Sequence, residues 1–498
     1  MSLAIVHSRA QVGVDAPAVT VEAHLANGLP SLALVGLPET AVKESKDRVR
    51  SAILNSAFEF PPRRITLNLA PADLPKDGGR FDLAIALGIL AASGQIPATA
   101  LENIECLGEL ALSGEIRSVR GVLPAALAAR ASGRTLVVPN ANAEEASLAS
   151  GLNVIAAGHL LQLAAHFNGL EVIAPYQSKG LLHHAQPYPD LSEVQGQLAA
   201  KRALLVAAAG SHNLLFSGPP GTGKTLLASR LPGLLPPLGE QEALEVAAIH
   251  SVASHTPLTA WPQRPFRTPH HSASGPALVG GGSRPQPGEI TLAHHGVLFL
   301  DELPEFDRKV LEVLREPLES GHIVIARARD KVRFPARFQL VAAMNPCPCG
   351  FLGDPSGRCR CSSEQIQRYR AKLSGPLLDR IDLHVTVARE TTALHVPEST
   401  GSDTAAGAAH VANARQRQMQ RQGCANAFLD LAGLRQHCPL QADDQLWLEN
   451  ACERLALSLR AAHRVLKVAR TLADLECAAE ISRQHLAEAM QYRGHAQS

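Results

Sequence analysis

Short stretches of alternating apolar and polar residues occur in the first third of the chain. The alternation at 65–69 and the apolar stretch at 135–139, which ends in a proline, predict β-strands. The largely apolar segment 81–92 predicts a buried helix. Residues 1–165 are therefore expected to form an α/β domain of their own.

Two further regions follow with different patterns. Residues 191–389 run from a helical pattern through an apolar strand, a glycine-rich turn and another helix, and this order predicts an α/β domain with a parallel sheet. Residues 411–498 keep the spacing of three to four that is typical of helices. The residues that set this spacing are Leu455, Leu459, Val465, Leu466, Ala469, Leu472 and Leu475.

Two segments with little periodicity separate these regions. Residues 166–190 contain several prolines, and residues 390–410 are small and polar, so both are expected to be linkers. The predicted fold class is a multidomain α/β protein with a C-terminal helical domain.

The composition narrows the possible functions. With 46% hydrophobic and 19% charged residues, the chain can bury sizeable cores. Because the formal net charge is only +1, any contact with nucleic acid must come from a local basic surface. The longest apolar run, 83–92, is too short to cross a bilayer, and the N-terminus has no secretory pattern. We therefore expect a cytoplasmic protein without a membrane partner.

A phosphate-binding motif lies at the glycine-rich turn. It fits G-x-x-x-x-G-K-[ST] and comes between an apolar strand at 213–217 and a helical run at 226–231, which is the context that this motif requires. Its backbone N–H groups can wrap phosphates, Lys224 can reach the β- and γ-phosphates of ATP, and the Thr225 hydroxyl can bind Mg²⁺. The motif consists of Gly218, Pro219, Pro220, Gly221, Thr222, Gly223, Lys224 and Thr225.

Two more apolar strands end in polar residues suited to ATP hydrolysis. The strand at 297–300 leads into Asp301, which can hold Mg²⁺, and Glu302, which can orient or deprotonate the attacking water. The strand at 338–344 leads into Asn345, whose amide can bind the γ-phosphate or the water. Each feature alone would also fit an ordinary turn, but their order after a P-loop favours hydrolysis.

A late arginine completes the candidate catalytic set. Arg380 could stabilise the charge on the transferred phosphoryl group. A surface ion pair with Asp379 or Asp382 fits the sequence equally well.

Four of the nine cysteines lie close together, directly after Asn345. Two C-x-C pairs offer four soft ligands, which suit tetrahedral Zn²⁺, although C-x2-C is the commoner spacing. Four reduced thiols in a loop are the alternative. The cysteines are Cys347, Cys349, Cys359 and Cys361.

The order of these motifs resembles the AAA+ superfamily. Longer segments resemble its magnesium-chelatase-like branch, and within that branch nearly the whole chain is similar to the ComM/YifB family. The segments that carry this resemblance are 28–30, 35–38, 68–78, 265–271, 287–290, 342–350, 374–382 and 468–474.

The resemblance implies a homo-hexameric ring. Arg380 would be an arginine finger that acts on the ATP of the neighbouring protomer. Arg460 resembles sensor 2 in a helical lid, with Arg464 as the second choice, and a solvated helix face is the alternative for both. Gln195 lies where AAA+ proteins hold the adenine, and a plain turn fits there nearly as well.

Similarity to the ComM branch also implies a branch-migration helicase that serves natural transformation and binds single-stranded and branched DNA. Two segments are candidates for lining the pore of the ring. One is 267–282, which contains His270 and His271, and the other is a predicted hairpin whose cations alternate onto one face. A structural turn and a solvated hairpin are the respective alternatives. The cations of the hairpin are Arg327, Arg329, Lys331 and Arg333.

The N-terminal domain resembles the Lon protease domain at 75–78 and 108–114. The serine of the Ser–Lys dyad in that family should follow 76–78, where this chain has Gly79-Arg80-Phe81. The lysine should fall near 122–124, where there is none. We therefore expect the fold without peptidase activity, and a role in DNA binding or ring assembly.

One alternative class stays open for the ATPase as a whole. A chelatase-type or chaperone-type enzyme would use the same motifs to insert a metal ion or to remodel a protein partner. Stimulation of hydrolysis by DNA separates this class from a DNA motor.

Overall fold

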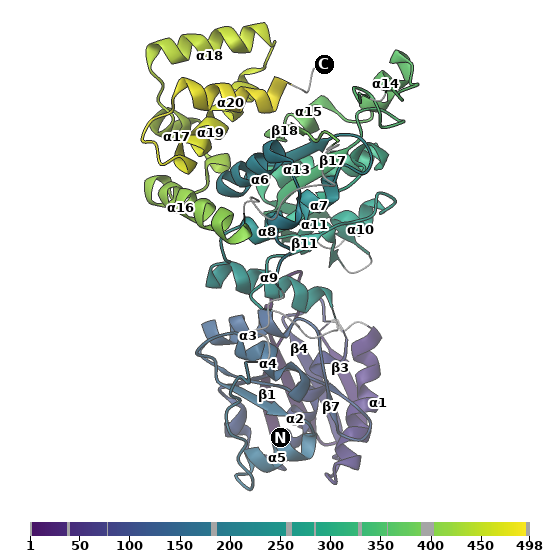
Figure 1. Cartoon of the computed structure of the whole chain (residues 1–498). Helices are drawn as coiled ribbons and strands as arrows, with labels where there is room; N and C mark the ends of the chain where they lie inside the picture. Colours follow the sequence, from purple (N-terminus) through teal and green to yellow (C-terminus); the bar gives the residue numbers. More distant parts are fainter. Residues whose placement is uncertain are drawn as a thin grey trace.

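The computed structural model describes residues 2–36, 40–76, 78–180, 187–254, 261–282, 285–326, 331–355, 357–389 and 403–494. These residues form an elongated molecule with three parts (Figure 1). An N-terminal α/β part lies at one end, a second α/β part lies in the middle, and the C-terminal helices pack on the middle part.

The sheet of the N-terminal part has seven strands: β1 (Ser2–Arg9), β2 (Ala18–Ala26), β3 (Ser31–Val35), β4 (Arg64–Ala70), β5 (Ile104–Cys106), β8 (Thr135–Pro139) and β9 (Val154–Ala157). Their order is β3-β4-β2-β1-β5-β8-β9. β2 runs antiparallel to β1 and β4, and all other neighbours are parallel. The strands predicted at 65–69 and 135–139 are confirmed.

One face of this sheet packs on helix α2 (Asp82–Ala92). Alternate residues of β2 and β4 are buried, because successive side chains of a strand point to opposite faces. Every residue of α2 is buried, which explains its apolar sequence and confirms the predicted helix. The remaining elements are α1 (Thr40–Asn55), η1 (Gly79–Phe81), η2 (Ala98–Leu101), β6 (Glu109–Leu110), β7 (Ile116–Arg117), α3 (Val122–Ala131), η3 (Asn140–Asn142), α4 (Ala143–Ser147) and α5 (Leu160–Phe167).

The middle part is built on a parallel sheet of five strands: β10 (Leu214–Ser217), β11 (Phe266–Arg267), β14 (Val297–Leu300), β17 (Gln339–Met344) and β18 (Leu383–Thr386). Their order is β11-β14-β17-β10-β18. The three strands predicted before the P-loop, Asp301 and Asn345 are therefore adjacent. Because they are parallel, their carboxyl ends meet at one edge of the sheet.

Helices and hairpins surround this sheet, and apolar clusters fill both of its faces. The predicted basic hairpin is present as β15 (His322–Ala326) and β16 (Lys331–Pro335). The other elements are η4 (Leu191–Glu193), α6 (Leu198–Gly210), α7 (Lys224–Ala228), α8 (Leu231–Leu234), α9 (Glu240–Ala253), α10 (Gly275–Val279), β12 (Gly280–Gly281), β13 (Gln286–Pro287), α11 (Glu289–Leu292), η5 (Leu303–Glu305), α12 (Arg308–Val313), α13 (Arg315–Ser320), α14 (Ser363–Arg370) and α15 (Gly375–Leu378).

The C-terminal part is helical, as predicted: α16 (Thr404–Gln422), η7 (Asn426–Phe428), α17 (Leu431–His437), α18 (Ala442–Arg454), α19 (Leu459–Leu475) and α20 (Arg483–Gly494). The structure differs at the start of this part, since α16 begins at Thr404 and not at 411. Its first turn is capped by the Asp403 side chain, a signal that the small polar composition of the segment obscured.

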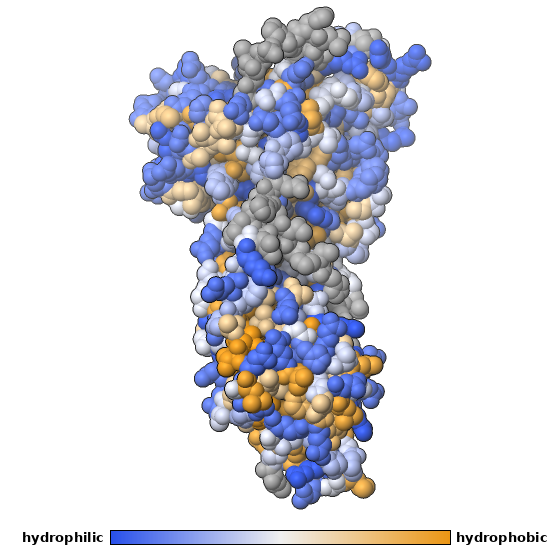
Figure 2. Space-filling view, turned by 60° about the horizontal axis from the view of Figure 1, so that its bottom comes forward, coloured by the Kyte–Doolittle hydropathy of each residue, from blue (hydrophilic) through white to orange (hydrophobic). Residues whose placement is uncertain are grey.

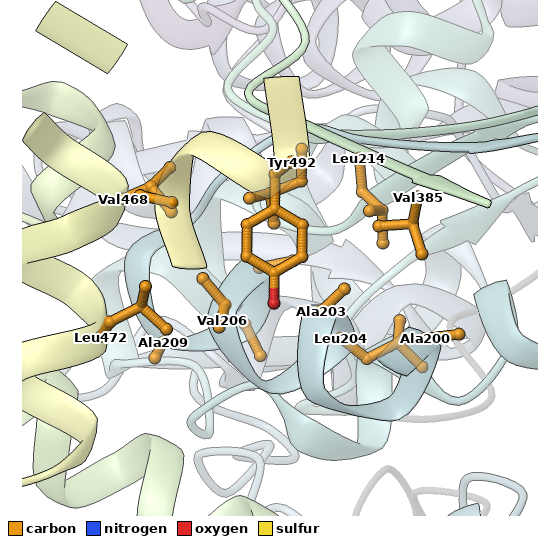
Figure 3. Close-up of a cluster of buried hydrophobic side chains, with 14 of the residues drawn as sticks. Ala200, Ala203, Leu204, Val206, Ala209, Leu214, Val385, Val468, Leu472 and Tyr492 are labelled. Atoms are coloured by element: carbon orange, nitrogen blue, oxygen red, sulfur yellow. The ribbon is translucent and has the colours of Figure 1, made fainter. Parts of the chain in front are cut away.

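The helical part shares a core with the middle sheet. In Figure 3, Val468 and Leu472 of α19 and Tyr492 of α20 lie against side chains of α6, β10 and β18. Two residues of the predicted apolar stripe, Leu455 and Leu459, lie outside this core. Leu459 is 74% exposed at the first position of α19, and Leu455 lies just after the end of α18. The helical part is thus fixed to the sheet by α19 and α20.

A buried polar network joins the same two parts. The imidazole of His212 lies between Asp382, at 3.2 Å, and the Thr471 hydroxyl of α19, at 2.8 Å. Arg464 of α19 forms an ion pair with the other oxygen of Asp382. Burial alone would raise the pKa of Asp382, but the hydrogen bond with His212 and the charge of Arg464 outweigh it and lower the pKa.

Replacing Asp382 with Asn should destabilise this junction by about 3–5 kcal/mol, the usual cost of removing one partner from a buried ion pair. Because the folded-state pKa is lowered, the stabilisation is complete above the ordinary aspartate pKa of about 3.9 and declines progressively as the pH falls from there through the lowered folded-state pKa. Urea unfolding at neutral and at acidic pH measures the difference, with Asp379→Asn as the control. A difference that did not shrink in acid would contradict this account.

The N-terminal and middle parts meet through α3 and α9, which lies at the waist in Figure 1. Leu123 of α3 is buried with Leu244 and Ala247 of α9. The backbone N–H of Gly121 donates to the Ser251 carbonyl at 2.8 Å. A movement of α9 would therefore be transmitted to the N-terminal part.

Large apolar side chains are exposed on the N-terminal part, and Figure 2 shows orange patches at that end of the molecule. Leu3 is 59% exposed and Leu29 is 88% exposed. Within the described residues, no helix combines the length and the apolar character that a membrane span requires.

Candidate nucleotide-binding site

The P-loop connects β10 to α7 at the carboxyl edge of the middle sheet, as predicted. Gly221 and Gly223 have φ angles of 78° and 84°, which glycine adopts without strain. A Cβ atom on Gly218 would lie 2.2 Å from the Val387 carbonyl oxygen, so only glycine fits this close approach to the chain after β18. The conformation of the loop therefore requires glycine at these three positions.

Lys224 brings the P-loop and the third predicted strand together. Its ammonium donates to the Gly218 carbonyl at 2.7 Å and to the side-chain oxygen of Asn345 at 3.2 Å. Burial lowers the pKa of Lys224, while the charges of Asp301 and Glu302 oppose this effect. A cation, an amide and two carboxylates therefore surround one position at the sheet edge.

Thr225 and Asp301 form a pair suited to a hard cation. The Thr225 hydroxyl donates to an Asp301 carboxylate oxygen at 2.6 Å. The other oxygen of Asp301 accepts from the backbone N–H of Glu302 at 2.9 Å. Hydroxyl and carboxylate oxygens are the protein ligands that Mg²⁺ takes beside phosphates, so this pair fits the ion.

Glu302 follows Asp301 in an unusual backbone conformation. Its φ angle is 52°, a region that residues other than glycine rarely occupy. Such conformations cluster at functional sites, where the surrounding structure maintains them. The carboxylate of Glu302 is 54% exposed and points to a histidine, His271.

His271, predicted to contact DNA together with His270, lies against this glutamate. Its Nδ1 atom is 3.3 Å from a Glu302 carboxylate oxygen. The ring of His270 packs on that of His271 with 4.1 Å between centroids, and His270 Nδ1 lies 2.8 Å from the Ser272 hydroxyl. The segment 267–282 therefore reaches the candidate catalytic carboxylate, a contact that the sequence did not reveal.

Arg380 and Arg460 converge on one carboxylate. Glu319, in α13, accepts from Arg380 at 2.6 Å and from Arg460 at 2.7 Å. Neither Asp379 nor Asp382 pairs with Arg380, in contrast to the alternative suggested by the sequence. Within the described residues, neither arginine makes a hydrogen bond or ion pair with the P-loop or Asp301. Glu319 was missed because an acid at a helix end carries no sequence signal.

Arg464, the second choice for sensor 2, occupies a different position. It pairs with Asp382 at the junction between the sheet and the helical part. Gln195, considered for the adenine, is exposed in the turn before α6. The neighbouring Gln197 donates to the Ala388 carbonyl at 2.7 Å and anchors this turn to the segment after β18.

The basic hairpin is described only in part. Lys331 and Arg333 are exposed on one face of β16, while Val332 and Phe334 are buried on the other. The predicted alternation is confirmed for these residues; Arg327 and Arg329 lie outside the described residues. A Cβ atom on Gly13 would come within 2.6 Å of Val332, so the hairpin packs against a turn of the N-terminal part.

The four clustered cysteines converge after β17. The sulfur of Cys347 lies 3.3 Å from that of Cys349 and 3.8 Å from that of Cys359. The ligand atoms of all four lie within 4.8 Å of one another. A hydrogen bond from the backbone N–H of Phe351 is the largest cause that lowers the pKa of Cys349, to about 6.

A second cluster, Glu245 with His294 and His295, does not suit a metal ion. Nδ1 of His294 accepts from the backbone N–H of Arg337 at 3.0 Å, and burial lowers the pKa of this histidine to about 4. The neutral ring therefore carries its proton on Nε2, which faces Glu245 at 3.1 Å. A metal ligand needs that nitrogen unprotonated, so we interpret the cluster as a hydrogen-bonded tie between α9 and the segment before β14.

The segment where a Lon-type serine would lie, Gly79-Arg80-Phe81, forms the buried turn η1 with Arg80 at its centre. This arginine is buried and donates to the Gln11 side chain at 3.2 Å. Residues 122–124, where the lysine of the dyad would fall, are buried at the start of α3.

Comparison with known proteins covers nearly the whole chain. Residues 190–394 match the family model described as magnesium chelatase, subunit ChlI, residues 401–493 match that of its C-terminal region, and residues 21–142 match that of subunit ChlI of Mg-chelatase. Competence protein ComM of Haemophilus influenzae is 54% identical over 99% of this chain and 98% of its own length. The uncharacterized protein YifB of Escherichia coli is 52% identical over 99% and 97%. The magnesium-chelatase 38 kDa subunit of Cereibacter sphaeroides is 28% identical over 32% of this chain and 53% of its own length.

Proposed function

The chain belongs to the family of ComM and YifB proteins, with a magnesium-chelatase-like AAA+ core, and from this premise we propose that it is an ATP-driven motor on DNA. In the most specific form of this proposal, the chain is a hexameric branch-migration helicase that acts on recombination intermediates during natural transformation. The competence protein ComM, at 54% identity, supports this choice over the alternative of remodelling a protein partner or acting in metal chelation.

The residues at the sheet edge suit ATP hydrolysis. Lys224 would bind the β- and γ-phosphates, and Mg²⁺ held by Thr225 and Asp301 would neutralise charge on the phosphate oxygens. Glu302 would accept the proton of the attacking water, and Asn345 would fix the position of that water. The contacts of Lys224 with Asn345 and of Thr225 with Asp301 support this assignment.

The contact between His271 and Glu302 is the observation that most favours a DNA-dependent enzyme. The segment that carries His271 is proposed to face DNA in the pore, together with the cations of the β15–β16 hairpin. A carboxylate paired with a histidine is less free to take a proton from water. DNA that moves this segment would therefore release Glu302 and speed hydrolysis.

His271→Ala should accordingly raise hydrolysis in the absence of DNA and reduce the stimulation by DNA. Hydrolysis is measured with and without single-stranded DNA, since the ratio of the two rates reports the coupling. His270→Ala is the matched control, because His270 lies against Ser272 and not against the glutamate. An unchanged ratio in His271→Ala would contradict this role.

The two arginines on Glu319 support action across a subunit interface. Because Arg380 and Arg460 share one carboxylate, an anion that attracts one would attract both. We propose that Arg380 reaches the ATP of the neighbouring protomer in a homo-hexamer, with Arg460 as the sensor 2 arginine of the helical lid. The exposed apolar surface of the N-terminal part, proposed to have the Lon-type fold without peptidase activity, would contribute to ring assembly or DNA binding.

The cysteine cluster is proposed to hold Zn²⁺. One Zn²⁺ ion with four sulfur ligands at about 2.3 Å requires sulfur–sulfur distances of about 3.8 Å. The observed distances of 3.3, 3.8 and 3.7 Å among Cys347, Cys349 and Cys359 are close to this tetrahedron.

A branch-migration assay tests the specific form of the proposal. A labelled three-stranded DNA intermediate is incubated with the full chain and ATP, and the exchanged strand is measured over time. The proposal expects ATP-dependent exchange that is lost in Lys224→Ala. ATP hydrolysis without any strand exchange would contradict it and favour the protein-remodelling alternative.

A further inference from the structure

The loop that carries the four cysteines is packed directly on the nucleotide site. Gly350, next to Cys349, has a φ angle of 82°, and a Cβ atom there would lie 2.6 Å from Pro220 of the P-loop. The same Cβ atom would lie 3.7 Å from the side chain of Asn345. The cysteine loop therefore lies directly between Pro220 of the P-loop and the side chain of Asn345.

A second connection leads from the far side of the loop back to Asn345. Helix α14 begins at Ser363, two residues after Cys361, and its first turn is capped by Ser362. Tyr369, near its end, is buried, and its phenol lies close enough to the backbone of Asn345 for that backbone to oppose the rise in the pKa of Tyr369 that burial causes. The Asn345 segment is thus held by the cysteine loop through Gly350 and by the helix that leaves the loop through Tyr369.

The backbone hydrogen bonds described within this loop join residues three apart, such as the Gly350 N–H, which donates to the Cys347 carbonyl at 2.9 Å. In the described part of 345–362 no residue lies in a helix or strand, and the apolar core takes in only Cys347 of the four cysteines. Three of the four cysteines are partly exposed. A metal ion that binds four ligands would constrain both halves of the loop at once and, with them, the start of α14.

We propose that the Zn²⁺ ion held by Cys347, Cys349, Cys359 and Cys361 is a structural lock: it fixes the position of Asn345 relative to the P-loop. The metal therefore controls ATP hydrolysis and not ATP binding. The effect on hydrolysis rests on the proposed ATPase activity, whereas the metal site does not. Binding is spared because the P-loop keeps its backbone cradle and Lys224. Hydrolysis depends on the exact position of Asn345, and a misplacement of about 1 Å can lower a rate by about 100-fold.

The metal site is tested first, without reference to activity. Elemental analysis of the purified full chain should find one zinc per protomer, and Cys361→Ser should lose it, while Cys477→Ser, at an exposed cysteine outside the cluster, should retain it. Replacement by Co²⁺ should give the visible absorption bands of tetrahedral cobalt thiolate. Iron in place of zinc, or no metal after expression with added zinc, would overturn the proposal.

The lock is tested on the wild-type chain, so that misfolding of a variant does not confuse the outcome. Zinc is removed by a chelator under reducing conditions and then restored, and ATP affinity and hydrolysis are measured at each stage. The proposal expects unchanged ATP affinity, a fall in kcat of about 100-fold without zinc, and recovery on its return. Equal kcat with and without zinc would overturn the lock but not the metal site. A zinc-loaded chain with no hydrolysis at all would instead contradict the proposed ATPase activity.

Discussion

Replacing Glu302 with Gln should leave ATP binding intact and lower the rate of hydrolysis by about 10²- to 10⁴-fold, the usual contribution of a general base. The amide has the shape of the carboxylate but cannot accept a proton from water. Thr225 and Asp301 keep their contact in this variant, so Mg²⁺ and ATP still have their ligands. ATP affinity and steady-state hydrolysis are measured on the same preparation.

Glu305→Gln is the matched control for this change. Glu305 lies three residues further along the chain, is exposed, and pairs with Lys372 at 3.1 Å. A surface ion pair of this kind contributes little to the free energy of folding, so the Glu305→Gln variant should hydrolyse ATP like the wild type. Equal losses in both variants, or a loss of ATP affinity in Glu302→Gln, would contradict the role of Glu302.

Replacing Arg380 with Ala should lower hydrolysis by about 10³- to 10⁵-fold if Arg380 is an arginine finger. Each ATP would lose the cation that stabilises charge on the transferred phosphoryl group. Arg380 is also buried against Glu319 in the same protomer. Thermal unfolding of the variant must therefore be measured beside its activity, with Arg368→Ala as the control, because Arg368 forms an exposed pair within α14.

Mixing the two inactive variants tests whether Arg380 acts across an interface. In a mixed assembly, some interfaces combine an intact Glu302 from one protomer with an intact Arg380 from its neighbour. These interfaces should hydrolyse ATP, so the mixture should be more active than either variant alone. No gain on mixing, with assembly demonstrated by sedimentation, would contradict action between protomers.

Much of the nucleotide site could be predicted from the sequence because its parts are local. A P-loop needs glycines at positive φ, a lysine and a hydroxyl in fixed order, and Gly221 and Gly223 adopt such angles. Buried parallel strands appear as apolar runs, so the strands before Asp301 and Asn345 could be located to within a residue. Their adjacency in the sheet follows from the topology of the P-loop fold.

The contacts that depend on tertiary structure could not be predicted. Glu319 is one of many acids, and only the fold brings it between Arg380 and Arg460. His271 was singled out by its motif, yet its position against Glu302 depends on how the loop after β11 returns to the sheet edge. The start of α16 was misplaced because a short polar cap, Asp403, precedes residues of weak periodicity.

The central claim is that DNA drives this ATPase, and the rate of ATP hydrolysis with and without single-stranded and forked DNA tests it most directly. The account predicts a clear rise in rate that weakens as salt increases, because phosphate contacts release counterions, and that is absent in Glu302→Gln. Intact basal hydrolysis that no DNA changes at low or moderate salt would contradict the account and point to a protein partner.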